Sequence, residues 1–248
     1  MKTKKLGAIF LIAGSFGLAL WYFWGELRDG ADVDKSGVSG TEDVAGGGEV
    51  AVPNLDAPVF ADSVSATEQA RLRPDIERIV AALNEDLTLY DSWLDLGSYR
   101  KLAGDYAGAE EIWLYMAANW PHDRAAYENL GDLYHLYIRD YPRAERYYRA
   151  ALRRDDTYPA LYMKFYELYA LSWSEKKELA DDILLEGLGK LPGHIGLLFT
   201  LAEYYASDGE HARAREYYRQ VRTLAEQAGD SKMVERVDEA VAALGTGN

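Results

Sequence analysis

The side chains best suited to chemistry in this chain are its histidines and two adjacent carboxylate pairs. The histidines are His122, His135, His194 and His211. None has a second histidine four residues away, and none has a carboxylate at metal-ligand spacing. His122 and His194 follow prolines, so we expect both in surface turns. The pairs Glu110–Glu111 and Asp181–Asp182 fall on predicted helices, where we expect them to face solvent instead of acting as acid and base.

The residues and motifs that other classes of chemistry require are missing from the sequence. The chain has 0 Cys, which excludes disulfides, thiolate metal sites and cysteine nucleophiles. No phosphate-binding loop, nucleophile elbow or zinc motif is present. The net charge of −14 disfavours a nucleic-acid partner. The sequence therefore predicts a protein that is not an enzyme, with no cofactor, no small-molecule substrate and no nucleic acid.

One acidic segment has the spacing of a cation site. Residues 32–37, DVDKSG, alternate oxygen donors and end in glycine, and Asp43 closes a 12-residue span. This resembles the calcium loops of EF-hand and dockerin modules. However, no amphipathic helix flanks the segment, Ser39 replaces the usual apolar residue, and Asp43 replaces the usual EF-hand glutamate. These departures favour an acidic linker, and we predict no metal site.

Most of the chain follows a repeat of about 34 residues. The repeat positions are Trp93, Leu96, Gly97, Ala109, Trp113 and Pro121 in the first copy; Tyr127, Leu130, Gly131, Tyr134, Ala144, Tyr148 and Ala151 in the second; Tyr162, Phe165, Tyr169, Ala180, Leu184 and Pro192 in the third; and Leu198, Leu201, Ala202, Tyr205, Ala214, Tyr218 and Val221 in the fourth. The second copy has one extra residue, expected in its internal turn, and the third has two around residues 172–174.

This spacing resembles the tetratricopeptide repeat, a helix–turn–helix unit with the pattern W-x2-L-G-x2-Y…A-x3-F…P. The resemblance covers residues 90–226, in repeats at about 90–123, 124–158, 159–194 and 195–228. Small residues at Gly97, Gly131 and Ala202 would let two helices approach closely. The aromatic residues could suggest a ligand cage, but their helical spacing favours a packed core. The predicted fold class is all-α: an α-solenoid of stacked helix pairs behind a single N-terminal transmembrane helix.

Two further helices should cap this stack, because a terminal repeat would otherwise expose apolar surface. Residues 65–89 have helical periodicity, with Pro74 near a kink or with the helix starting at Asp75. Residues 229–248 contain a final amphipathic helix at about 231–244.

The N-terminal region has the pattern of a membrane anchor. After a basic start at residues 1–5, residues 6–24 form an uncharged run of 19 residues, long enough as a helix to span about 28 Å. Lysines before the run and acidic residues after it place the N-terminus in the cytoplasm and the rest of the chain outside it. The alternative is a cleaved signal peptide, although no small-residue cleavage site follows. Ala13 and Gly17 could support a homodimer through the anchor.

Residues 25–64 are predicted to be a disordered tether. They contain seven Gly, nine acidic and two basic residues, with too little apolar surface to offset the chain entropy of folding. A flexible chain of about 40 residues reaches roughly 35 Å. The repeats could then occupy a shell near the membrane.

The resemblance implies that the first helices of successive repeats line a concave groove. The family's groove positions fall on Leu94, Ser98, Leu102, Glu128, Asn129, Asp132, Leu136, Met163, Lys164, Glu167, Leu171, Phe199, Thr200 and Glu203. This face is mixed, with excess acid and Lys164 as its main cation. Only Asn129 and Lys164 match a carboxylate clamp, so we expect no such clamp, and a basic or amphipathic segment fits better.

The function implied by the resemblance is that of a bacterial-type envelope scaffold. It would be a membrane-tethered, extracytoplasmic protein-interaction module that binds an extended or helical segment of an envelope or membrane protein. Two alternatives stay open. One is a chaperone-like or secretion accessory factor that captures clients at the membrane, and the other is a self-assembling structural protein.

Overall fold

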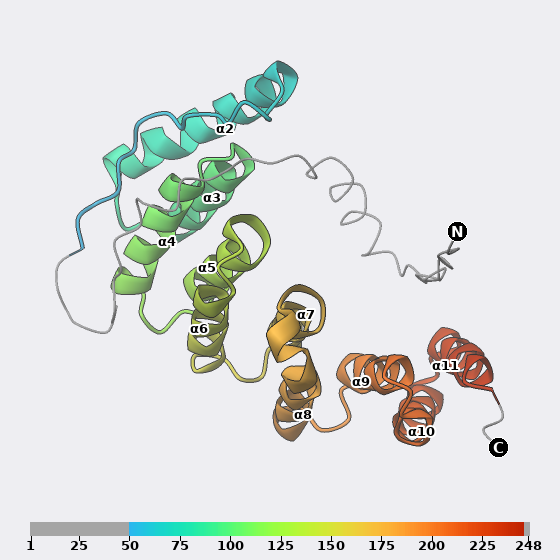
Figure 1. Ribbon diagram of the computed structural model, residues 1–248. Coiled ribbons are helices and arrows are strands. Elements are labelled where there is room, and N and C mark those ends of the chain that lie inside the picture. The colour runs from blue at the N-terminus through green and yellow to red at the C-terminus, as the bar shows by residue number, and fades with distance from the viewer. Residues whose placement is uncertain (1–49, 246–248) are drawn as a thin grey trace. The chain divides into compact units, whose positions relative to one another are not determined.

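The computed structural model describes residues 50–245, whose helices follow one another in pairs after a first helix, α2 (Figure 1). The elements are α2 Ala66–Glu85; α3 Tyr90–Leu102 and α4 Tyr106–Asn119; α5 Ala125–Asp132, the π-helix η1 Leu133–Ile138 and α6 Tyr141–Leu152; α7 Pro159–Glu167, the π-helix η2 Leu168–Ser172, the 3₁₀-helix η3 Ser174–Leu179 and α8 Ala180–Lys190; α9 Ile195–Ser207 and α10 His211–Ala228; and α11 Ser231–Ala243. The predicted α-solenoid of stacked helix pairs is confirmed.

Close approach of the two helices in the first and second repeats depends on a glycine that faces a ring. A Cβ at Gly97 of α3 would lie 2.8 Å from Trp113 Cε2 on α4, and one at Gly131 of α5 would lie 2.5 Å from Tyr148 Cε1 on α6. Both rings are fully buried. The aromatic residues of the repeats therefore form the packed core, as predicted from their helical spacing.

Local capping signals in the sequence set the starts of the second helices in the first two repeats. Asp105 accepts a hydrogen bond from the Gly108 N–H at 2.9 Å and so caps α4. The preceding Gly104 has φ of +77°, a left-handed conformation that glycine adopts without strain. Asp140 caps α6 in the same way through the Arg143 N–H, at 3.1 Å.

The structure places the extra residue of the second repeat differently from our expectation. The second repeat accommodates its extra residue within the widened helical turns of η1, before the chain reverses at Arg139 with φ of +61°. In the third repeat, η2 ends at Ser172 and η3 begins at Ser174, which is where the two extra residues were expected. A π-helix absorbs an inserted residue without ending the helix. The helix can therefore continue to its end with Tyr134 still buried.

The structure also differs from the predicted tether, because residues 50–64 lie against the first repeat. The Arg100 guanidinium donates to the Asn54 carbonyl at 2.5 Å and to the Asp56 carbonyl at 2.9 Å. The Ala61 N–H donates to the Ala103 carbonyl at 2.9 Å. We call residues 50–64 the strap. Its composition suggested disorder, but α3 supplies hydrogen-bond partners that compensate its ordering cost.

Helix α2 runs without interruption through Pro74, from an N-cap at Ser65 whose hydroxyl accepts from the Glu68 N–H at 3.2 Å. The alternative start at Asp75 is therefore wrong. The other predicted cap is present as α11.

Several predictions concern residues outside 50–245. They are the anchor at 6–24, the tether from 25 to 49 and the calcium-like segment from Asp32 to Asp43. Within the described part of the chain, no helix combines the length and apolar character needed to cross a membrane.

Candidate protein-interaction site

The predicted groove residues lie on the first helices of the pairs, and three of them meet. Lys164 of α7 places its Nζ 2.7 Å from Glu128 Oε1 and 2.6 Å from Asp132 Oδ2, both on α5. Arg124 also pairs with Glu128. Lys164, which we expected to be the main cation of this face, is therefore neutralised by the preceding repeat. The sequence pattern did not indicate this neutralisation.

A partly buried hydrogen-bond chain runs from Asp132 through the second repeat to Ser172 of the third. The Tyr148 hydroxyl donates to Asp132 Oδ1 at 2.8 Å, so it accepts from His135 Nδ1, which lies 3.2 Å away. His135 Nε2 is then the acceptor for the Ser172 hydroxyl, at 2.9 Å. His135 is only 4% exposed, and this burial lowers its pKa to about 4. The imidazole is thus a neutral structural link between η1 and η2.

Two further carboxylates on this face, unlike Glu128 and Asp132, have no ion-pair partner in the described part of the chain. Glu167 of α7 is half-buried and Glu203 of α9 is exposed, and neither forms an ion pair within residues 50–245. Desolvation raises the pKa of both, and repulsion by Asp132 adds to the effect at Glu167, while attraction by Lys164 at Glu167 and by Arg236 at Glu203 opposes it. Ionised carboxylates in such surroundings would gain from an external cation.

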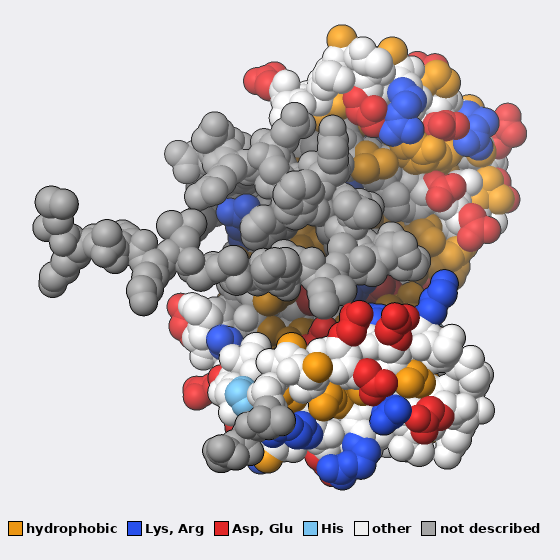
Figure 2. Space-filling model, turned by 90° about the vertical axis from the view of Figure 1, so that its right-hand side faces the viewer, with side chains coloured by type: hydrophobic (Ala, Val, Ile, Leu, Met, Phe, Trp, Pro, Cys, Tyr) orange, Lys and Arg blue, Asp and Glu red, His pale blue; other side chains and the backbone are white. Residues whose placement is uncertain are grey.

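In each of the first three repeats, one leucine stands exposed near the C-terminal end of the first-helix segment. Leu102 is 46% exposed, Leu136 is 46% exposed and Leu171 is 77% exposed. Leu136 belongs to η1 and Leu171 to η2, the two π-helices that His135 and Ser172 connect. We call Leu102, Leu136 and Leu171 the leucine row. Figure 2 shows one face of the molecule on which acidic side chains lie next to hydrophobic ones.

The remaining predicted groove residues are partly covered by contacts with other residues of the protein. Phe199 is only 6% exposed, with the Arg236 guanidinium 4.5 Å from its ring centroid and Tyr218 against it, so it offers little surface. The Ser98 hydroxyl donates to the Leu94 carbonyl at 3.0 Å. The other four positions, all half-buried, are Leu94, Asn129, Met163 and Thr200.

We expected the adjacent pairs Glu110–Glu111 and Asp181–Asp182 to face solvent, but the first carboxylate of each pair is hydrogen-bonded within the protein. Glu110 is buried and accepts a hydrogen bond from the Tyr134 hydroxyl, and Asp181 accepts one from the Tyr205 hydroxyl at 2.8 Å. In both cases the tyrosine follows the acid by 24 residues. This spacing links two consecutive repeats, so it is present in the sequence but not within any single motif.

His194 is in a turn, as expected, and its Nδ1 accepts from the Leu197 N–H at 3.2 Å to cap α9. His122 is exposed between α4 and α5.

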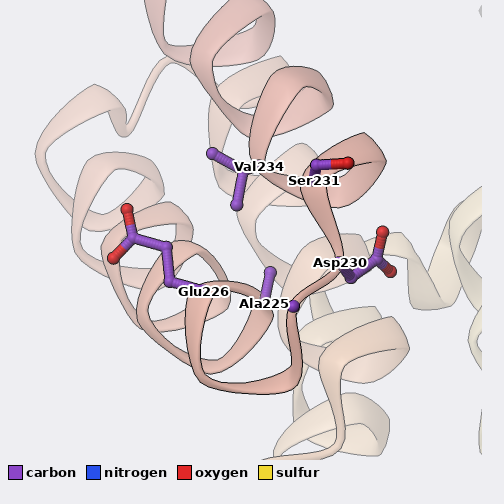
Figure 3. A pocket seen from close by; sticks show the side chains of 6 residues that line it. Ala225, Glu226, Asp230, Ser231 and Val234 are labelled. Atoms are coloured by element: carbon purple, nitrogen blue, oxygen red, sulfur yellow. The ribbon is translucent and has the colours of Figure 1, made fainter.

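A shallow pocket at the turn between α10 and α11 offers no chemistry (Figure 3). Its lining residues are Ala225, Glu226, Gly229, Asp230, Ser231 and Val234. The Asp230 carboxylate already accepts from the Met233 N–H at 3.0 Å. No cluster of His, Cys, Asp and Glu able to hold a metal occurs in the described residues.

Comparison with known proteins identifies likeness at the level of fold. No family model matches this sequence, and no curated protein does. The crystal structure of MamA superimposes with a TM-score of 0.50 at 18% identity, covering 66% of this chain and 97% of that one. A thermophilic TPR protein, TTC0263 from Thermus thermophilus, gives 0.47 at 21% identity, with 71% and 93% covered. A second MamA structure gives 0.44 at 18% identity, with 62% and 91% covered.

The helix pairs, the small residues facing rings and the likeness to MamA agree with one another. The part of the chain from residue 50 to residue 245 has a tetratricopeptide-repeat-like fold, an α-solenoid.

Proposed function

We propose that this protein is a membrane-tethered scaffold that binds a segment of a partner protein on the extracytoplasmic side. The binding surface is formed by the first helices of the repeats, and we call it the first-helix face. The observation that carries the binding role is the leucine row, which ends at Leu171, four residues after Glu167, while Glu203 lies on the first helix of the next repeat. Exposed apolar side chains that recur on successive repeats are typical of an interaction surface. The uncharged run at residues 6–24 supports the tether, and the charges on either side of it support the orientation.

Binding is tested by capturing partners from solubilised membranes with the full-length protein in detergent. The test variant is Leu136→Asn with Leu171→Asn. The matched control is Leu179→Asn with Leu185→Asn, because these leucines are also exposed but lie on η3 and α8. We expect one or two stoichiometric partners that the test variant loses and the control retains. Equal capture by both variants would refute binding through this face, and a broad set of weakly held clients would favour the chaperone-like role.

Topology is tested separately, and the absence of cysteine makes the test simple. Single cysteines are introduced at Thr3 and at the exposed Ser231, and intact cells are treated with a membrane-impermeant maleimide. We expect labelling at position 231 in intact cells and at position 3 only after lysis. The reverse pattern, or recovery of the protein in the soluble fraction, would contradict the tether or its orientation.

A further inference from the structure

The charges on the first-helix face divide into two groups. Glu128 and Asp132 are compensated by Lys164, and Glu128 also by Arg124. Glu167 and Glu203, on the next two first helices, have no ion-pair partner in the described chain. The face therefore carries carboxylates without an ion-pair partner in the third and fourth repeats of the described chain, and the net charge of −14 on the whole chain would attract cations to it.

The acidic and apolar positions have the same spacing in the second and third repeats. Asp132 precedes Leu136 by four residues, and Glu167 precedes Leu171 by four residues. Residues four apart lie on the same side of a helix, one turn from each other. The second and third repeats thus each present a carboxylate one turn before an exposed leucine, and Leu102 of the first repeat and Glu203 of the fourth repeat extend the two rows in opposite directions.

A partner must match both rows at once. An amphipathic helix carries an apolar stripe beside a charged stripe along its whole length, so it can contact both. An extended strand places successive side chains on opposite sides and would turn alternate side chains away from the face.

The apolar part of the face is held in place before any partner arrives. Leu136 and Leu171 lie on η1 and η2, and the hydrogen bond between buried His135 and half-buried Ser172 joins these two π-helices. A preformed surface loses little conformational entropy on binding, which favours a defined partner over many clients.

We propose that the first-helix face binds a cationic amphipathic helix of a partner protein, whose apolar stripe packs on Leu102, Leu136 and Leu171 while its Lys or Arg residues pair with Glu167 and Glu203. This inference rests on the proposed function and specifies the chemistry of the partner.

The test uses synthetic 18-residue amphipathic helices and the full-length protein in detergent. One helix is built from Leu and Lys, and its counterpart from Leu and Glu with the same apolar stripe. Binding is followed by fluorescence anisotropy. A carbodiimide then couples peptide lysines to carboxylates in contact with them, and mass spectrometry identifies the positions. Partition of the peptide into detergent is common to all protein variants, so differences between variants report on the protein face.

The decisive comparison is between two variants with the same net charge. Glu167→Gln with Glu203→Gln removes the uncompensated carboxylates of the face. Glu111→Gln with Glu178→Gln removes two exposed carboxylates on α4 and η3. We expect the Leu/Lys helix to couple to Glu167 and Glu203, and its affinity to fall roughly tenfold in the first variant and less than about twofold in the second.

Two results would overturn the inference: equal binding of the Leu/Glu helix, or equal losses in the two charge variants. Failure of this inference can be told from failure of the proposed function. If Leu136→Asn with Leu171→Asn still abolishes capture of a natural partner, the face binds proteins but does not select cationic helices. If that variant changes neither capture nor peptide binding, both proposals fail.

Discussion

The hydroxyl of Tyr169 donates a 2.6 Å hydrogen bond to the carboxylate of Glu145, 24 residues earlier in the chain. The bond joins the first-helix segment of the third repeat to the second helix of the repeat before it. The other pairs with this 24-residue spacing are Tyr99 with Asp75, Tyr134 with Glu110 and Tyr205 with Asp181. Because Asp75 lies on α2, that helix takes the place of a second helix before the first repeat.

Loss of one of these hydroxyls should cost more where the acid is buried. Tyr134→Phe leaves the buried Glu110 without this donor, and we expect about 1–3 kcal/mol of destabilisation. Tyr99→Phe should cost less than about 1 kcal/mol, because Asp75 keeps Arg78 as a partner and stays in contact with water. Urea unfolding followed by circular dichroism measures both, and equal losses would contradict the role of burial.

The glycines that face core aromatic rings should not tolerate a larger side chain. Gly131→Ala places a methyl group 2.5 Å from Tyr148 Cε1, so we expect it to lower the free energy of unfolding by about 1–3 kcal/mol. Gly189→Ala is the matched control, since it also lies in a helix but has no atom within 4 Å. That change should stabilise the protein by up to about 1 kcal/mol. Destabilisation by both would indicate that close packing is not the cause.

Attachment of the strap should depend on Arg100. Arg100→Met removes the donors to the Asn54 and Asp56 carbonyls and the 3.0 Å ion pair with Asp105. We expect a loss of about 3 kcal/mol and faster hydrogen exchange at the Ala61 N–H. Thermolysin cleavage within residues 50–64 should also accelerate. Arg78→Met, at an exposed ion pair, serves as the control. Unchanged exchange at Ala61 in the Arg100 variant would refute the attachment.

Buried His135 should make the stability of the fold sensitive to mild acid. Its folded pKa is about 4, below the unfolded value near 6.5, so the unfolded state binds the proton more readily between these values. Stability should therefore fall as the pH drops from about 6.5 to about 4, by up to about 3 kcal/mol. The neighbouring charges oppose each other, since Asp132 raises the pKa of His135 and Lys164 lowers it.

The matching control for this pH dependence is His135→Gln, which retains polar atoms but does not titrate in this range. Its unfolding free energy should vary less with pH in this window than that of the wild type, as measured by urea titration at several pH values. Parallel curves for the two proteins would show that carboxylates, and not His135, control acid sensitivity.

The helix pairs could be predicted from the sequence because each is specified by neighbours in the chain. Gly97 and Gly131 recur at the repeat period with a ring that follows in the second helix. Asp105 and Asp140 cap the helices that begin immediately after them. Packing of this kind needs only small and large residues at fixed spacing, so it leaves a pattern that can be read directly.

The sequence by itself thus determined the repeat, its helix pairs and the helices that carry the candidate face. The tertiary structure decided which side chains on that face remain available. Lys164 is neutralised from 36 and 32 residues away, Phe199 is covered by Arg236, and Arg100 holds backbone carbonyls 46 and 44 residues earlier. Such contacts depend on how one repeat lies on the next, and backbone acceptors are the same for every residue type. They therefore leave no motif in the chain.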